Sequence, residues 1–249
     1  MPYFLTSSSC LPDSPALNPA NGFVDELKKV LPGPCRALFV CSDPDRPGLT
    51  YGFAEDMAGS FGEIGITFTA AEVLERENQD RCGELVGRAD LIFLVGGHVP
   101  TQNEFFQEID LREELRNWDG VLVGVSAGSM NAAGVVYAQP EEPGEAVDPG
   151  YRRFLPGLGL TKTMLLPHYQ MVRDKVLDGL RRYEDITYAD SVGRWFYVRV
   201  DGSYLLGKNG GEELRGEAYL IENGALTQIC RENERSEEHT SDPDLPGKR

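Results

Sequence analysis

One serine lies directly after an apolar segment, in the stretch GVLVGVSAGSMNAAG at 120–134. Gly124-Val-Ser-Ala-Gly128 matches the GxSxG pattern, which places a reactive hydroxyl on a sharp turn between a strand and a helix. Glycines on both sides leave room where a side chain would clash with that turn. The pattern indicates that Ser126 is a nucleophile for acyl transfer, although a chance match in a glycine-rich chain is the competing interpretation.

A serine hydroxyl needs a general base within hydrogen-bond reach, and histidine is the usual one. The chain has three histidines, His98, His168 and His239. His239 lies in a polar tail that we exclude from the fold. His168 ends the apolar run Met164-Leu-Leu-Pro-His, where the catalytic groups of open α/β sheets gather, so we expect it to be the base.

A second glycine pair, Gly96-Gly97, follows the apolar run 90–95. Glycines free the backbone to turn and to present N–H groups to the oxyanion of a tetrahedral intermediate. We therefore assign the oxyanion hole to the amides of Gly97 and Ala127. A plain glycine turn between a strand and a helix is the alternative interpretation of this pair.

Strand-like and helical segments alternate along the first half of the chain, which is typical of βαβ units. The sequence predicts a doubly wound α/β fold with a mostly parallel sheet and helices on both faces. We expect strands at 36–41, 64–69, 90–95 and 120–125, helices at 51–61, 71–86 and 103–115, and a further strand in the N-terminal MPYFLTSS.

The second half is less regular. Apolar residues at 172, 176, 177, 180 and 183 keep helical spacing, and 186–189 has the composition of a strand. The strand-like pieces 195–200 and 217–221 are accompanied by Asp201-Gly202 and Asn223-Gly224, which favour hairpin turns. We expect a C-terminal antiparallel hairpin extension of the sheet and a single domain over 1–234.

The composition limits the class of protein. A formal net charge of −16 argues against nucleic-acid or membrane-surface binding, because both need a basic patch. Five scattered cysteines without a CxxC pair fit neither a disulfide framework nor a zinc site, so we expect no metal and no cofactor. We find no secretory signal and no apolar run long enough to span a bilayer, so we expect a cytoplasmic protein.

The last residues, 235–249, are charged and almost free of apolar side chains. Such a composition predicts disorder. The opening of this tail, RSEEHTS, looks like a translated sequencing adapter, so we expect the tail to be non-native and the natural C-terminus to lie near Asn233.

Three motifs in order, VGGH..TQNEFF, GVSAGSMNAA and LLPHYQ, resemble the peptidase E family of serine peptidases, which includes aspartyl dipeptidases and is related to cyanophycinases. The resemblance implies a fold akin to class I glutamine amidotransferases, Ser126 as nucleophile and His168 as base. It also implies removal of an N-terminal aspartyl residue from a short, acidic peptide. A second copy of the chain, as a homodimer, is compatible with the sequence.

The triad also needs a carboxylate that orients the imidazole. Asp190, after the predicted strand 186–189, is our first choice, with Glu141 and Glu142 as alternatives. For an acidic substrate, Arg173 is the candidate cation, because guanidinium pairs with carboxylate in a bidentate manner. His98 stands where relatives often carry another glycine, and we expect it to contact substrate.

Other functions remain to be weighed. A glutamine amidotransferase is disfavoured, because Ser126 replaces the cysteine nucleophile of that class and Gln170 stands where its His-x-Glu relay needs a glutamate. A cyanophycinase or an esterase would use the same serine machinery with another pocket. A binding protein that kept the fold and lost the chemistry is the alternative outside enzymes.

Overall fold

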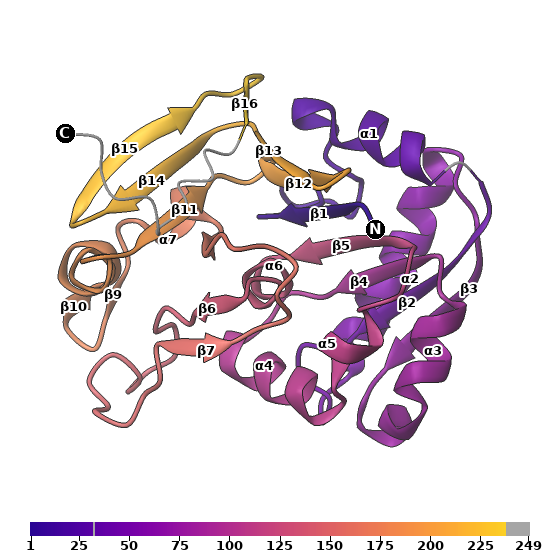
Figure 1. The fold of residues 1–249 in the computed structure, drawn as a ribbon, viewed down its shortest axis with the longest axis horizontal. Helices are drawn as coiled ribbons and strands as arrows, with labels where there is room; N and C mark the ends of the chain where they lie inside the picture. The colour runs from indigo at the N-terminus through magenta and orange to yellow at the C-terminus, as the bar shows by residue number, and fades with distance from the viewer. Residues whose placement is uncertain (32, 238–249) are drawn as a thin grey trace.

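An eight-stranded sheet forms the centre of the molecule in a computed structural model that describes residues 1–31 and 33–237 (Figure 1). Its strand order is β16-β13-β12-β1-β5-β4-β2-β3. The strands β1, β5, β4, β2 and β3 pair in parallel. These parallel strands are β1 (Tyr3–Thr6), β2 (Cys35–Val40), β3 (Phe68–Leu74), β4 (Leu91–Leu94) and β5 (Val121–Val125).

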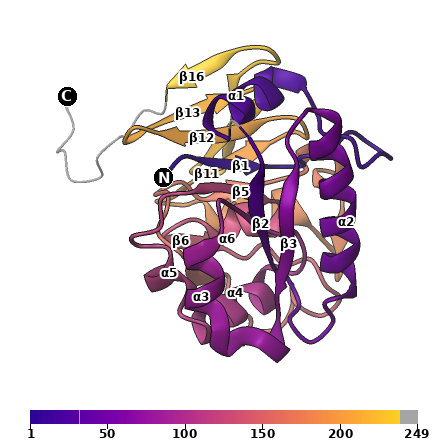
Figure 2. The ribbon, with the colours of Figure 1, turned by 90° about the vertical axis from the view of Figure 1, so that its right-hand side faces the viewer.

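Helices cover both faces of this sheet. In Figure 2, α2 lies on one side of β2 and β3, and α3 lies on the other. The helices connecting the parallel strands are α1 (Phe23–Val30), α2 (Gly48–Glu63), η2 (Arg76–Arg81), α3 (Cys82–Arg88), α4 (Val99–Glu108) and α5 (Leu111–Glu114), with the short η1 (Ala20–Gly22) before α1. The predicted doubly wound α/β fold with helices on both faces is confirmed.

The order of the parallel strands creates a crevice. From β2 the chain crosses to β3 on one side, whereas from β4 it crosses to β5 on the other. The loops after β2 and β4 therefore diverge at the carboxyl edge of the sheet. Open α/β sheets bind ligands at such a switch point, so the fold alone directs attention to the residues after β1, β2, β4 and β5.

The C-terminal half extends the sheet and adds a second one. Strands β12 (Tyr204–Lys208), β13 (Gly211–Arg215) and β16 (Arg235–Glu237) join β1 in antiparallel order, as the predicted hairpin extension requires. The second sheet has the order β15-β14-β11-β8. Its strands are β8 (Leu165–Leu166), β11 (Trp195–Arg199), β14 (Ala218–Glu222) and β15 (Ala225–Cys230).

Short elements complete the described chain. Two small antiparallel pairs join β6 to β7 and β9 to β10. These elements are α6 (Ala127–Asn131), β6 (Val135–Tyr137), β7 (Phe154–Pro156), α7 (Tyr169–Val172), β9 (Val176–Leu177), β10 (Leu180–Arg181), η3 (Arg182–Thr187) and α8 (Tyr188–Asp190). None of the helices in the described ranges has the length and apolar character needed to cross a membrane.

An aromatic cluster anchors α2 to the sheet. Phe39 of β2 and Phe93 of β4 stack with ring centroids 4.8 Å apart. Phe53 and Phe61 of α2 meet Phe93 edge to face, at 5.9 and 5.7 Å. Offset and edge-to-face rings add to the stabilisation from burial, so this cluster fixes β4, and with it the loop that begins at Gly96.

Several predicted boundaries are wrong for local reasons. The strand expected at 64–69 is β3, which begins only at Phe68, because Ile64 ends helix α2 and Gly65 then turns with a φ of +87°. The helix expected at 71–86 is the end of β3 followed by η2 and α3. Helix α4 begins at Val99, before the predicted Asn103, which is buried within it. The sequence analysis did not predict α1.

The helix predicted over 172–183 and the strand over 186–189 are both absent from the described structure. Asp178 and Gly179 have φ values of +53° and +83°, so they form a tight turn between β9 and β10 and interrupt the helical spacing. The residues expected to form the following strand lie in η3 and α8. Asp201-Gly202 likewise does not close a hairpin, because β11 and β12 on either side of it belong to different sheets.

The C-terminal tail is described only in part. Its first residues form β16, which pairs with β13, so the expected disorder is wrong for 235–237. The backbone of this segment completes an edge of the sheet even though its side chains are polar. The rest of the predicted tail, 238–249, including His239, lies outside the described residues.

Replacing Phe93 with alanine should lower the free energy of unfolding by about 3–5 kcal/mol, because loss of a fully buried ring would leave a cavity between β4 and α2. Phe53→Ala is the matched control, since Phe53 is only partly buried and should cost less. Urea unfolding followed by circular dichroism measures both. Equal losses for the two variants would contradict the central role given to Phe93.

Candidate active site

Ser126 stands at the turn between β5 and α6. It follows Val125 directly and has φ +50° and ψ −113°, a conformation that is strained for a residue with a side chain. Its N–H donates to the carbonyl oxygen of Thr6 at 3.1 Å, and its carbonyl oxygen accepts from Ser129 and Met130 at 3.0 and 3.1 Å. The turn therefore lifts the side chain off the end of the strand while the backbone stays hydrogen bonded.

The glycines around Ser126 are required by close approach. A Cβ on Gly128 would lie 2.0 Å from the carbonyl oxygen of Leu94, and one on Gly124 would lie 3.0 Å from Ser129. On the neighbouring loop, a Cβ on Gly96 would come within 3.2 Å of Ser126 Cβ, and one on Gly97 would overlap Ser42. The Gly96 backbone thus lies against Ser126 and the Gly97 backbone against Ser42, whereas the oxyanion role of the Gly97 amide stays a prediction.

His168 and Asp201 come from neighbouring strands of the second sheet. Strands β8 and β11 pair in parallel, with Leu166 opposite Val198. His168 lies two residues beyond the end of β8, and Asp201 lies two residues beyond the end of β11. Since parallel strands end at the same edge, this register brings the imidazole and the carboxylate together.

The three side chains form a continuous hydrogen-bonded series. Ser126 Oγ lies 2.9 Å from His168 Nε2, and His168 Nδ1 lies 2.7 Å from Asp201 Oδ1. Burial alone would raise the pKa of Asp201, but hydrogen bonds from His168 and Ser7 outweigh it and hold the pKa below its ordinary value. Asp201 is therefore an anion at neutral pH, able to keep a proton on Nδ1 and leave Nε2 free to accept one.

Asp190, the expected third member, is placed elsewhere. Its carboxylate accepts from Tyr137 Oη at 2.7 Å and pairs with Arg153 Nη1 at 2.9 Å. The residues before Asp190, expected to form a strand, are helical. They therefore do not carry Asp190 to the edge of the sheet at which His168 lies. Asp201 was overlooked because Asp-Gly indicated a hairpin turn. Its position just after a predicted strand was the signal that could have found it.

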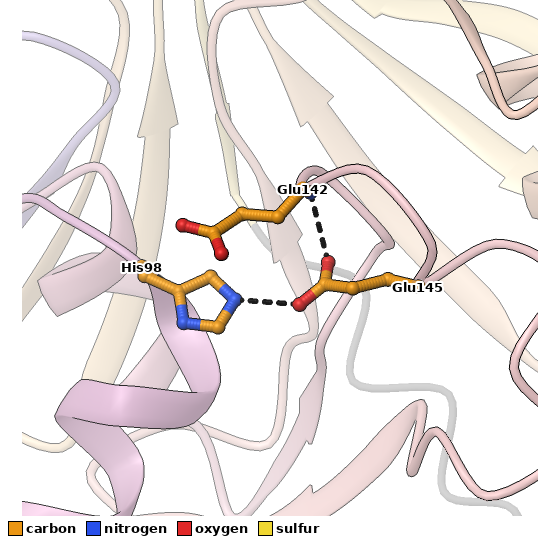
Figure 3. Close-up of side chains that lie close together, drawn as sticks. All are labelled: His98, Glu142 and Glu145. Carbon is orange, nitrogen blue, oxygen red and sulfur yellow. Dashed lines mark hydrogen bonds and ion pairs between the residues drawn. The ribbon is translucent and has the colours of Figure 1, made fainter.

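The alternative acids do not contact His168 Nδ1 either. Glu141 Oε1 accepts the N–H of Val99 at 3.3 Å, and burial raises the pKa of Glu141. Glu142 is exposed and lies beside His98 and Glu145 (Figure 3). Both glutamates belong to the loop between β6 and β7, beside the start of α4.

His98 and Glu145 tie this loop to the end of β4. His98 Nε2 lies 2.8 Å from Glu145 Oε1, and His98 Nδ1 lies 2.8 Å from Thr101 Oγ1. The second oxygen of Glu145 accepts the N–H groups of Glu141 and Glu142 at 2.8 and 3.0 Å. Both nitrogens of the imidazole are thus used within the protein, so its expected contact with substrate stays a prediction.

The same cluster is the group best suited to a metal among the described residues. Ligand atoms of His98, Glu142 and Glu145 lie within 4.8 Å of one another, and Figure 3 shows the three side chains converging. However, the bonds from His98 and two backbone amides already satisfy Glu145. The arrangement is complete as a loop clamp and needs no ion to explain it.

Two arginines differ as candidates for binding an acidic substrate. Arg173, the predicted one, has a largely exposed side chain that pairs with the adjacent Asp174 at 3.2 Å. Arg182 donates from Nη2 to Gln139 at 2.8 Å, while its buried Nε has no hydrogen-bond partner among the described residues. Burial raises the pKa of Glu141 and the charge of Arg182 opposes that rise, so Arg182 faces the loop beside the start of α4. No spacing pattern along the chain pointed to Arg182.

Comparison with known proteins shows the family of this chain. The sequence matches the family model of peptidase family S51 over residues 3–195. The chain belongs to that family. The family is one of serine peptidases, so this protein is a serine peptidase with a peptide as substrate, and the expected likeness to peptidase E is confirmed. A search of curated proteins gave no match.

Solved structures support the fold of this S51 peptidase. A peptidase from an acI-B1 actinobacterium aligns with a TM-score of 0.62 and 18% identity, covering 95% of this chain and 96% of the other. A peptidase E protein from Listeria monocytogenes EGD-e aligns with a TM-score of 0.60 and 14% identity, covering 92% and 98%. At these identities the likeness concerns the fold.

Asp201→Asn should slow labelling of Ser126 by a fluorophosphonate by roughly 10³- to 10⁴-fold, because an amide cannot hold the imidazole in the required tautomer. Asp190→Asn is the matched control and should label at nearly the wild-type rate, with its effect confined to stability through Arg153. Intact-protein mass spectrometry over time measures both rates. Fast labelling of Asp201→Asn would contradict the assignment of Asp201.

Proposed function

We propose that this S51 peptidase cleaves short peptides through a Ser126–His168–Asp201 triad and that it prefers peptides whose first residue is acidic. The observation that carries the proposal is the uninterrupted pair of hydrogen bonds from Ser126 through His168 to Asp201, at 2.9 and 2.7 Å. A binding protein that had lost the chemistry would have no reason to retain this geometry. The family places the substrate among peptides.

The reaction follows from the positions of the protons. His168 Nε2 accepts the hydroxyl proton of Ser126 as Oγ attacks the scissile carbonyl carbon. The C–N bond then breaks, and the imidazolium returns the proton to the leaving amine, which gives an acyl-enzyme. Water attacks the ester with His168 again as base, and Ser126 is released together with the free acid. Asp201 stabilises the imidazolium in both steps.

The tetrahedral oxyanion needs hydrogen-bond donors that point at the oxygen on which the negative charge develops. Gly97, on the loop against Ser126, and Ala127, the first residue of α6, supply the backbone N–H groups in this proposal. The absence of side chains at Gly96 and Gly97 allows the loop to lie close to Ser126 and Ser42. Two fixed amides in this position typically account for a large part of the rate acceleration.

The protein has a net charge of −16, so binding an acidic residue of the substrate requires a cationic side chain near the site. Arg182 is the better candidate, because its buried Nε is unsatisfied among the described residues and a carboxylate would provide the missing acceptor. Arg173 is already paired at the surface. Cyanophycinase-like and esterase activities would use the same triad, and they differ from dipeptide cleavage only in what the pocket accepts.

Hydrolysis of four dipeptides that differ only in the first residue, Asp, Glu, Asn or Ala, tests the proposal. We expect cleavage of the aspartyl peptide and a loss of at least about 10³-fold in Ser126→Ala without loss of folding. Retained activity in Ser126→Ala would exclude the serine mechanism. If none of the four is cleaved but a fluorophosphonate still labels Ser126, dipeptides are not the substrate, and β-linked acidic polymers or esters become the favoured substrates.

Arg182→Gln should reduce kcat/KM for the aspartyl peptide by about 10- to 100-fold, the effect of losing a charged hydrogen bond. It should reduce cleavage of the alanyl peptide much less, because that peptide has no side-chain carboxylate to pair with the guanidinium. Arg173→Gln removes an equal charge at an exposed position and is the matched control. If Arg173→Gln had the larger effect, the earlier expectation for Arg173 would be restored.

A further inference from the structure

We propose that Ser7 is a positioning residue of the active site, which holds His168 and Asp201 in the geometry that lets Ser126 react. The proposal rests on the proposed triad. Ser7 follows β1 directly and is fully buried. Its Oγ donates to Asp201 Oδ1 at 2.8 Å and accepts the backbone N–H of His168 at 2.7 Å. One hydroxyl from the first sheet thus joins two residues of the second.

The direction of both bonds is fixed by chemistry. The N–H of His168 can only donate, so Ser7 must accept there with a lone pair. A serine hydroxyl has a single proton, and in this arrangement it points at Asp201. Since that proton goes to Oδ1, the oxygen that also receives His168 Nδ1–H, the carboxylate is held as an acceptor towards the imidazole.

The backbone of His168 explains why such a support is needed. His168 has a φ of +58°, and a non-glycine residue in this region is strained and persists only where its surroundings enforce it. Its N–H is bound by a side chain, Ser7 Oγ, where a strand would use a backbone carbonyl. An alanine at position 7 would leave this N–H without its partner and would remove one of the two hydrogen bonds that Asp201 Oδ1 accepts.

Ser126 has the same support from the neighbouring residue. Its φ is +50°, and its N–H is held by the carbonyl oxygen of Thr6. The end of β1 therefore holds the backbone of both reacting residues at positive φ. Of the two contacts, only the one from Ser7 depends on a side chain, so only that one can be removed by substitution.

The test compares Ser7→Ala with Ser9→Ala. Ser9 is also buried and lies two residues further along, but its Oγ contacts Cys10 Sγ at 3.6 Å and does not touch the triad. We expect Ser7→Ala to slow both fluorophosphonate labelling and kcat by about 10- to 100-fold, the effect of losing a hydrogen bond to a charged group. KM should change by less than about 2-fold, because Ser7 touches no substrate. Ser9→Ala should match wild type in all three.

A spectroscopic measurement separates positioning from general damage. The proton on His168 Nδ1 gives a far-downfield NMR signal when it is bonded to a carboxylate, and the signal is assigned by its loss in His168→Gln. We expect this signal to shift or broaden in folded Ser7→Ala and to remain in Ser9→Ala. An unchanged signal together with wild-type labelling in Ser7→Ala would overturn the proposal, as would equal slowing in the two variants.

The outcome is also distinct from failure of the proposed function. If the wild-type protein cleaves none of the peptides and is not labelled, the proposed mechanism fails, whereas the NMR comparison still reports whether Ser7 holds the imidazole and the carboxylate together. A shifted signal in Ser7→Ala then supports the positioning role in an inactive protein, and an unchanged one rejects it.

Discussion

The carboxyl end of β1 is the constraint on which the active site depends. Within three residues, the Leu5 carbonyl accepts from Arg199, the Thr6 carbonyl accepts from Ser126 and Ser129, and Ser7 binds both His168 and Asp201. Ser126 follows β5 of the first sheet, whereas His168 and Asp201 follow β8 and β11 of the second. These bonds fix the two sheets relative to each other at the point where proton transfer needs a separation of about 3 Å.

Arg199 is an unusual part of this junction. It is fully buried, and its Nε and Nη2 have no hydrogen-bond partners among the described residues. Burial lowers the pKa of its guanidinium to about 9, although the negative charge of Asp201 opposes the shift. An arginine in such a place still carries its charge at neutral pH, and that charge in turn favours the anionic form of Asp201. The charge of the buried Arg199 guanidinium and the ionisation of the Asp201 carboxylate therefore stabilise each other.

The sequence was sufficient for the residues that lie at the ends of strongly apolar strands. Ser126 and His168 could be placed because each follows a recognisable strand, and Gly96-Gly97 because parallel strands end at one edge. The partner of His168 could not, because it depends on β8 pairing with β11 rather than on any local signal. The predicted strand before Asp190 failed because Asp178-Gly179 interrupts a regular apolar spacing. Non-local pairing and a single turn therefore account for the misplaced acid.

The position of β1 in the middle of the large sheet also has a consequence for the order of folding. Leu5 pairs with Gly124 on one side and with Leu205 on the other. Both partners are distant in sequence, and pairings of this kind form slowly. During synthesis, β1 can complete its pairing only after β5 and then β12 have emerged from the ribosome. A nascent chain that ends between His168 and Asp201 already holds the serine and the histidine, but it lacks both the carboxylate that orients the imidazole and the second partner strand of β1.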